Sequence, residues 1–210
     1  AFKDALKDPL SGQRREGSTL LPEGTASAPH SLQPKLRDLQ RRVRKAYLGQ
    51  LRRRLDAILD ACRAWGVRIV VFPEYSVPAP LLAPLAQRAG DMVVVAGSHY
   101  VDQETLREGV YESLGSEPRP ELLGQAVSPI LYEGRLLSLV PKLHAAKPEL
   151  AHLDLGKEWA PVDLPGDLPG PMGVLICLDF LYRQSPKHRE LAAAPLEGCR
   201  LLAAPSLTPE

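Results

Sequence analysis

The stretch "VVFPEYSVP" (residues 70–78) decides the fold class of this chain. It overlaps an apolar run, residues 67–72, that has the length and the β-branched content of a strand. A continuous run of this kind is typical of a strand that is buried on both faces. Glu74 follows two residues after the run. The sequence therefore predicts a strand of an α/β sheet that presents a carboxylate at its end.

Helical and strand patterns alternate on both sides of this strand. Apolar residues recur every three or four positions over residues 32–65, where Gly49 is an expected break and Gly66 an expected stop. Glu133–Gly134 suits the turn of a β-hairpin. Helices that alternate with apolar strands predict an α/β domain with its helices outside the sheet. The further expected strands are at 18–21, 92–97, 128–132, 136–140, 174–177 and 201–204, of which 128–132 and 136–140 form the hairpin. We also expect a helix at 80–90, a polar helix at 185–194 and irregular stretches at 101–124 and 142–159.

Composition places the chain among globular proteins. Its 210 residues suffice for one domain, and 44% are hydrophobic while 24% are charged. We expect a polar lead-in over residues 1–31 and a folded domain over 32–210. The net charge of +1 gives no reason to expect a polyanion-binding protein as a whole. Three cysteines argue against a disulfide framework and for a reducing compartment, so we expect a cytoplasmic protein. We expect no membrane span, because no apolar run approaches the required length, and no metal, because no Cys/His cluster has zinc spacing. We expect no cofactor either.

Two other reactive side chains follow apolar strands in the same way. Lys142 comes directly after the second hairpin strand, and Cys177 ends the strand at 174–177. Taken singly, such a cysteine is more often a small core residue, and such a glutamate or lysine is more often solvated. Together they suffice for acyl transfer, because a thiol attacks, a carboxylate takes its proton and an ammonium stabilises the oxyanion.

The surroundings of these residues are specific. "VVFPEYSVP" (70–78), "LVPKLHA" (139–145) and "GVLICLDF" (173–180) resemble the three signature segments of the nitrilase, or carbon–nitrogen hydrolase, superfamily, and they occur in that family's order. Three supporting segments, "DMVVVAGS" (91–98), "YEGRLLSLVPK" (132–142) and "GCRLLAAPS" (198–206), are similar to the family as well. The resemblance spans about residues 50–206. It implies an α-β-β-α sandwich, in which two packed mixed sheets are flanked by helices.

Carried over residue by residue, the resemblance implies a role for each reactive group. Glu74 would be the general base, Lys142 would stabilise the oxyanion, and Cys177 would be the nucleophile that forms a thioester. Leu178 would add its backbone N–H to the oxyanion hole.

Many family members have a second glutamate after the lysine. Glu149 is the first candidate for this position and Glu158 the second. Asp179 matches the aspartate of the family's Cys-x-Asp pattern, where it holds the turn after the nucleophile. Cys62 and Cys199 have no counterpart in the motifs, and we interpret them as core or surface thiols.

The chain also departs from the family pattern. Position 178 is Leu where an aromatic residue is common, and "DFLYRQSPKH" lacks the usual Arg-Phe-Pro. We therefore expect an unusual acyl pocket, and the sequence does not identify its substrate. The family continues beyond the segment that ends here at Glu210, so we expect a fragment, a trimmed domain or a divergent member, with a second sheet that is incomplete at its C-terminal end.

Two functions fit these observations. The first is a thiol amidohydrolase, a homo-oligomer by resemblance, that acts on a small amide, nitrile or carbamoyl compound or on glutamine. The second is a binding or assembly module of a larger protein with little turnover. Residues 35–54 hold nine Lys or Arg and one acid, Asp38, which suits nucleic acid or an acidic partner. The simpler interpretation of this basic stretch is the solvated face of an amphipathic helix.

Overall fold

The computed structural model describes residues 33–147, 149–182 and 185–207. The chain divides into two compact units, residues 1–45 and 46–210, and the division falls inside the first helix. The lead-in expected at 1–31 and the strand expected at 18–21 lie outside the described residues. None of the described helices is long and apolar enough to cross a membrane.

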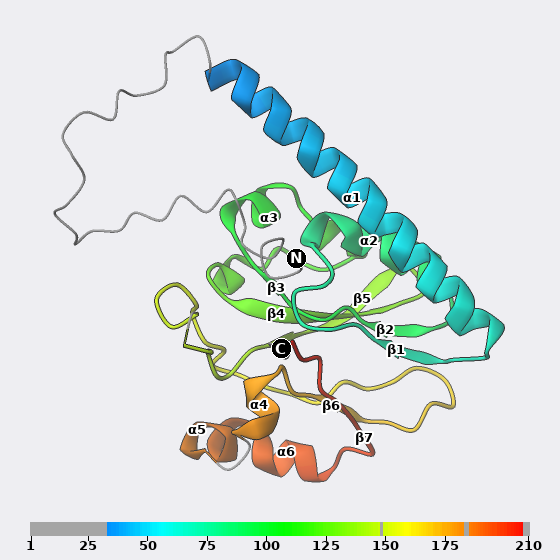
Figure 1. Ribbon diagram of the computed structural model, residues 1–210. Coiled ribbons are helices and arrows are strands. Elements are labelled where there is room, and N and C mark those ends of the chain that lie inside the picture. Colours follow the sequence, from blue (N-terminus) through cyan, green and yellow to red (C-terminus); the bar gives the residue numbers. More distant parts are fainter. Residues whose placement is uncertain (1–32, 148, 183–184, 208–210) are drawn as a thin grey trace, which may run out of the picture. The chain divides into compact units, whose positions relative to one another are not determined.

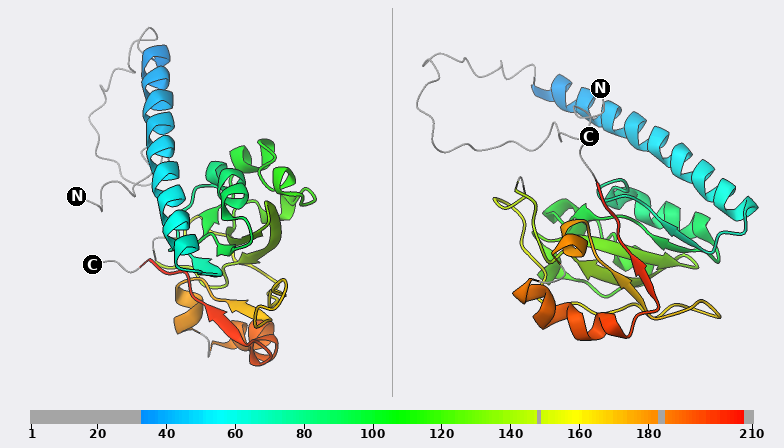
Figure 2. Two further views of the ribbon diagram at one scale, coloured as in Figure 1. Left: turned by 90° about the vertical axis from the view of Figure 1, so that its right-hand side faces the viewer. Right: turned by 60° about the horizontal axis from the view of Figure 1, so that its bottom comes forward.

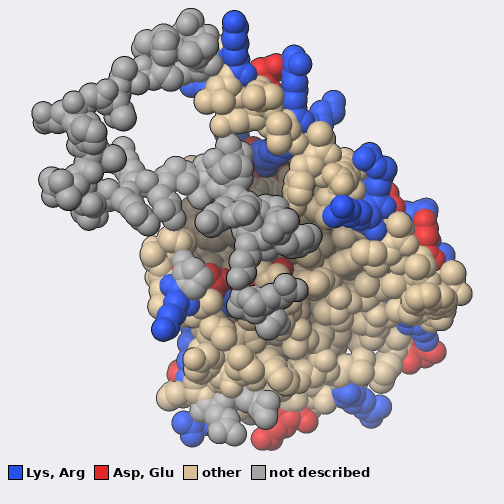
Figure 3. Space-filling model, viewed as in Figure 1, with Lys and Arg blue, Asp and Glu red and all other residues tan. Residues whose placement is uncertain are grey.

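The first helix, α1, runs without interruption over Gln33–Ala64. The break expected at Gly49 was wrong, because one glycine costs a helix only about 1 kcal/mol and the flanking residues favour the helix. Gly66 lies just beyond the end of the helix with a φ of 68°, as a C-terminal stop requires. In the second unit, Leu55 and Leu59 of α1 are buried in the core. Figure 3 shows Lys and Arg side chains along α1, some of them paired with Asp38 or Asp56.

The larger sheet has five strands. β1 pairs with β2, and β2 pairs with β4. β4 also pairs with β3 and with β5. β1 and β2 are parallel and the other pairs are antiparallel, so the sheet is mixed as predicted. Its strands are β1 Ile69–Val71, β2 Val93–Val95, β3 His99–Tyr100, β4 Ala126–Tyr132 and β5 Arg135–Pro141.

The hairpin β4–β5 forms where the sequence predicted it. Glu133 and Gly134 have φ values of 46° and 75°, the two positive angles of a two-residue type I′ turn. The register pairs Tyr132 with Arg135 and runs to Val127 opposite Pro141, with one irregularity in β4. This register fixes where β5 ends and therefore where Lys142 begins.

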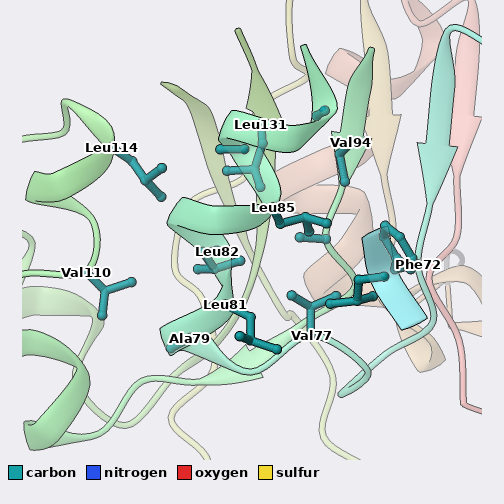
Figure 4. Close-up of a cluster of buried hydrophobic side chains, with 14 of the residues drawn as sticks. Phe72, Val77, Ala79, Leu81, Leu82, Leu85, Val94, Val110, Leu114 and Leu131 are labelled. Carbon is teal, nitrogen blue, oxygen red and sulfur yellow. The ribbon is translucent and has the colours of Figure 1, made fainter. Parts of the chain in front are cut away.

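Burial on both faces belongs to β2 rather than to β1. Val93 and Val95 join one buried cluster, whereas Val94 between them joins the cluster shown in Figure 4. β1 is instead an edge strand in which Val71 is 42% exposed, so the expectation of two buried faces was wrong for β1. The apolar run reflects strand propensity there, and its end continues toward the site.

Short helices cover one face of the large sheet. α2 Leu82–Ala89 follows a single 3₁₀ turn, η1 Ala79–Leu81, and together they form the helix predicted at 80–90. Leu82 and Leu85 pack against the sheet (Figure 4). The stretch 101–124, expected to be irregular, holds three short helical segments: α3 Gln103–Arg107, η2 Glu112–Leu114 and η3 Pro120–Leu122.

The second sheet consists of a parallel pair, β6 Met172–Val174 and β7 Leu201–Ala203. It packs on the other face of the large sheet through the cluster that contains Val93, Val95 and Ile130. The helix predicted at 185–194 is a succession of short segments, and α4 precedes it. These outer segments are α4 Leu178–Leu181, α5 Pro186–His188, η4 Arg189–Ala193 and α6 Ala194–Glu197.

The layers of the second unit are helix, sheet, sheet and helix (Figures 1 and 2). This arrangement confirms the α-β-β-α sandwich. In the described residues the smaller sheet is a parallel pair of strands, and Val162 adds an antiparallel bridge to Met172 of β6. β6 also begins earlier than predicted and ends at Val174, so Cys177 lies three residues beyond it.

Candidate active site

The topology brings Glu74 and Lys142 to one end of the large sheet. β1 is parallel to β2, and β5 has the same direction as β2 because each is antiparallel to β4. Glu74 lies just past the C-terminal end of β1, and Lys142 follows β5 directly. The common strand direction therefore places both side chains at the same edge, although 68 positions separate them in the chain.

Gly97 makes the close approach at this edge possible. A Cβ atom at Gly97, where φ is 69°, would lie 2.0 Å from the backbone oxygen of Pro73. Beyond this contact Glu74 pairs with Ser98, whose carbonyl accepts a hydrogen bond of 3.0 Å from the N–H of Tyr75. Sequence analysis did not assign Gly97 to the site. The signal was a glycine at the end of an apolar strand, where a close backbone approach is one of the usual reasons.

Lys142 lies between two carboxylates. Its Nζ is 2.7 Å from Oε1 of Glu74 and 2.8 and 2.7 Å from the two carboxylate oxygens of Glu149. The side chains of Lys142, Glu74 and Glu149 are 1%, 4% and 15% exposed. Three charged groups at this depth are stable only as partners, because each alone would face a desolvation cost of several kcal/mol.

The protonation states follow from these contacts. Burial alone lowers the pKa of the Lys142 ammonium, but the hydrogen bonds and charges of Glu149 and Glu74 raise it above its usual range. Burial likewise raises the pKa of Glu149, whereas hydrogen bonds from Lys142, Tyr75 and the N–H of Ala146 bring it below its usual range. At neutral pH the site therefore holds a Lys142 ammonium and a Glu149 carboxylate.

Tyr75 is a member of this cluster that sequence analysis missed. Its hydroxyl donates a hydrogen bond to Glu149, and its ring centroid is 5.8 Å from Nζ of Lys142. Burial, followed by the nearby Glu149, raises the pKa of the phenol, so it remains a donor. Its φ of 57° is unusual for a bulky residue, and such conformations concentrate at functional sites. The signal in the sequence was only its position next to Glu74.

Cys177 lies in a sharp turn between β6 and α4. Its φ and ψ are 50° and −104°, and its N–H donates to the carbonyl of Pro205 at 2.9 Å. Burial raises the pKa of the thiol, and the charge and hydrogen bonding of Glu74 raise it further. The N–H of Leu207 and the charge of Lys142 oppose this increase. The raised pKa keeps the thiol protonated at neutral pH, and the charges of both Glu74 and Lys142 act on it.

Asp179 connects the cysteine turn to the lysine loop. It is 1% exposed and accepts hydrogen bonds from the N–H groups of Leu143, at 3.1 Å, and His144, at 2.7 Å. It thus binds backbone groups of the segment that carries Lys142 while it lies two residues after Cys177. Leu178, between Cys177 and Asp179, is the first residue of α4.

The remaining sequence candidates lie elsewhere. Glu149 is the glutamate that contacts Lys142, and Glu158, the second candidate, is exposed. Cys62 packs against the core from α1, and Cys199 packs against the cluster between the sheets. The structure therefore brings together Glu74, Lys142, Glu149 and Cys177.

The comparison with solved structures bears on the fold. A glutamine-dependent NAD+ synthetase from Acinetobacter baumannii matches 77% of this chain with a TM-score of 0.51 at 16% sequence identity. This chain shares the fold of the matched part of that synthetase, a nitrilase-type α-β-β-α sandwich. The match confirms the resemblance at the level of fold, since identity this low does not extend to activity.

Two further nitrilase-type structures match less closely. A carbon–nitrogen hydrolase from Helicobacter pylori has a TM-score of 0.49 at 17% identity over 74% of this chain. A mutant of the Nesterenkonia AN1 amidase from the nitrilase superfamily has a TM-score of 0.47 at 20% identity, also over 74%. The chain spans 30% of the synthetase, 53% of the hydrolase and 60% of the amidase. Neither a protein-family model nor a curated protein matches the sequence.

Proposed function

We propose that this chain is a carbon–nitrogen hydrolase that cleaves a non-peptide C–N bond through an acyl-enzyme on Cys177. One observation carries the proposal: the buried Lys142 ammonium lies 2.7 Å from Glu74, and the charges of both groups act on the pKa of the Cys177 thiol. A base, a nucleophile and a fixed positive charge therefore meet at one sheet edge. The nitrilase-type fold supports the same class.

Glu74 activates the nucleophile. Because the pKa of Cys177 is raised, the thiol keeps its proton until it reacts. As sulfur attacks the substrate carbon, the proton passes to the Glu74 carboxylate, which is the role of a general base.

Lys142 stabilises the charge that develops on the substrate. An amide carbonyl becomes an oxyanion when sulfur adds to it, and a pre-positioned ammonium stabilises that charge most effectively in a site that excludes water. The N–H of Leu178, the residue after the nucleophile, is the second donor.

The reaction completes in two stages. The C–N bond of the tetrahedral intermediate breaks, the nitrogen takes the proton from Glu74, and ammonia or an amine leaves a thioester on Cys177. Glu74 then takes a proton from water as the water attacks the thioester. The acid is released and the sulfur regains the proton. The two stages need no cofactor.

Glu149 holds Lys142 in place. Both of its oxygens bind the ammonium, and the hydroxyl of Tyr75 and the N–H of Ala146 hold the carboxylate in turn. A lysine bound by two carboxylates has little rotational freedom, so its charge needs little reorganisation during the reaction.

The substrate class is a small amide, nitrile or carbamoyl compound. Glutamine is a useful first substrate to test, because the synthetase with this fold is described as glutamine-dependent. The resemblance also favours a homo-oligomer, which sedimentation velocity tests. The three cysteines favour a cytoplasmic protein.

The test is covalent labelling with acrylamide, a small amide-shaped electrophile, followed by mass spectrometry of peptides. We expect selective modification of Cys177, with slower modification of Cys62 and Cys199. Glu74→Gln should slow the reaction at least tenfold, because a buried thiol with a raised pKa reacts slowly without its base. Lys142→Met should slow it by a similar factor, because the thiol loses the positive charge that lowers its pKa. Cys177→Ser is the background control, and ammonia release from an amide panel is measured in parallel.

The second candidate function is a binding or assembly module. The observation that favours it is the row of basic side chains on α1 (Figure 3). Slow labelling of Cys177 that does not depend on Glu74, together with salt-dependent binding of nucleic acid, would support this function and contradict the hydrolase.

A further inference from the structure

A chain of side-chain hydrogen bonds lies beside the proposed site and takes no part in the mechanism above. Asp179 Oδ1 is 3.0 Å from Nδ1 of His144, and Nε2 of His144 is 2.7 Å from Oγ of Ser185. The chain thus joins the segment that carries Lys142 to two points on the segment that follows Cys177.

Hydrogen bonding assigns the donors along this chain. Asp179 already accepts N–H bonds from Leu143 and His144, so it acts as an acceptor and the Nδ1–H of His144 donates to it. In the neutral imidazole Nε2 then accepts the hydroxyl proton of Ser185. Burial raises the pKa of Asp179, and these same N–H donors and His144 oppose that rise. The imidazole of His144 therefore links the side chains of Asp179 and Ser185.

The ring of His144 is also fixed by packing. It stacks on Tyr182, with 5.6 Å between the centroids and 23° between the planes. The N–H of Ser185 donates to the carbonyl of Tyr182 at 2.8 Å, and the carbonyl of Ser185 accepts from Arg189 at 3.0 Å. Stacking and the two hydrogen bonds hold one imidazole against α4 and the start of the outer helices.

The hydrogen bonds of Asp179, His144 and Ser185 lie close in sequence to both Lys142 and Cys177. His144 is two residues after Lys142, and Asp179 is two residues after Cys177. The segment "DFLYRQSPKH" (179–188) is also where the chain departs most from the family pattern. α4 has only four residues, so its own backbone bonds do little to fix the orientation of the first N–H, that of Leu178.

We propose that His144 is a positioning residue that, through Asp179 and Ser185, holds the segment after the nucleophile in register with Lys142. This inference rests on the proposed function, since these hydrogen bonds would place Cys177 and the Leu178 N–H relative to the Lys142 charge. The imidazole itself does not touch the reacting atoms.

Acrylamide addition to Cys177 tests the proposal in the full chain. Ser185→Ala and His144→Asn remove the link to Ser185, and His144→Asn retains an amide donor toward Asp179. Each should slow the addition about fivefold, the rate equivalent of about 1 kcal/mol for one hydrogen bond. Ser185→Thr retains the hydroxyl and should restore the wild-type rate. The pH at which addition is half-maximal should move toward that of an ordinary thiol in the first two variants.

A matched control separates positioning from stability. The hydroxyl of Ser113 donates to the carbonyl of Val110 at 2.6 Å in another part of the domain. Ser113→Ala should therefore lower the melting temperature about as much as Ser185→Ala while it leaves both the addition rate and its pH profile unchanged. Rates within twofold of wild type for Ser185→Ala and His144→Asn, with an unchanged profile, would overturn the proposal.

A second measurement does not depend on a reactive thiol. Backbone amide hydrogen exchange in residues 178–189 should become faster in Ser185→Ala and His144→Asn and remain unchanged in Ser113→Ala. If exchange becomes faster while the labelling rate of Cys177 does not depend on Glu74, the positioning role of His144 would stand and only the hydrolase function would be contradicted. Unchanged exchange would contradict the positioning role itself, whatever the reactivity of the cysteine.

Discussion

Replacement of Lys142 by methionine tests the charge arrangement of the site most directly. Methionine has a similar length and no charge, so Lys142→Met leaves Glu74 and Glu149 as two buried carboxylates without their cation. Removal of one partner from a buried ion pair typically costs about 3–5 kcal/mol. A domain of 150–250 residues loses roughly 2–4 °C of melting temperature per kcal/mol. We therefore expect the melting temperature to fall by roughly 6–20 °C at pH 7.

The pH dependence of this loss has a definite sign. In the wild type the pKa of Glu149 is below its usual value, so its contribution is present above the unfolded pKa and is lost as the pH falls through the folded pKa. In Lys142→Met burial raises the pKa of Glu149 without the opposing ammonium, and protonation at acid pH relieves the variant. The difference in melting temperature should therefore be largest near pH 7 and should narrow toward pH 4.

Thermal unfolding followed by circular dichroism measures both quantities. Lys147→Met is the matched control, because Lys147 lies in the same loop and is exposed. Its melting temperature should change by less than about 2 °C. A shift in Lys142→Met as small as that of the control, or a shift that does not vary between pH 7 and pH 4, would refute the buried ion cluster.

Three further substitutions test separate parts of the site. Gly97→Ala should destabilise the domain by more than about 2 kcal/mol in urea unfolding, because its Cβ would meet the Pro73 oxygen. Gly115→Ala, where φ is also positive but no atom lies within 4 Å, should cost only about 1 kcal/mol. Equal losses of stability in the two variants would contradict the close approach. Glu149→Gln should lower the rate of acrylamide addition to Cys177 or of amide turnover about a hundredfold, since Lys142 would lose one carboxylate partner. It should also weaken the dependence of stability on pH below neutrality. An unchanged rate would assign the role of second glutamate to another residue. Tyr75→Phe should cost about 1.5–3 kcal/mol of stability, as expected for a hydrogen bond to a charged group, and a change below about 0.5 kcal/mol would show that Glu149 finds another donor.

The sequence identified most of the secondary structure for simple physical reasons. Gly134 readily adopts the positive φ of a tight turn, and this preference predicted the hairpin between the two apolar strands. The break expected at Gly49 was wrong because a local preference of about 1 kcal/mol does not outweigh the packing of Leu55 and Leu59, which holds the helix in the second unit. Boundaries near Cys177 moved because a strand and a sharp turn share the same apolar composition.

The sequence by itself determined the order of the elements, the α/β class and the segments after apolar strands that carry Glu74, Lys142 and Cys177. Strand propensity, turn chemistry and polar residues at strand ends are local properties, so one chain can reveal them. Only the tertiary structure decided that Glu149 rather than Glu158 reaches Lys142, that Tyr75 donates to Glu149, and that His144 joins Asp179 to Ser185. These contacts join residues 7 to 74 positions apart, and strand direction and sheet packing bring them together. No periodicity in the sequence records that geometry.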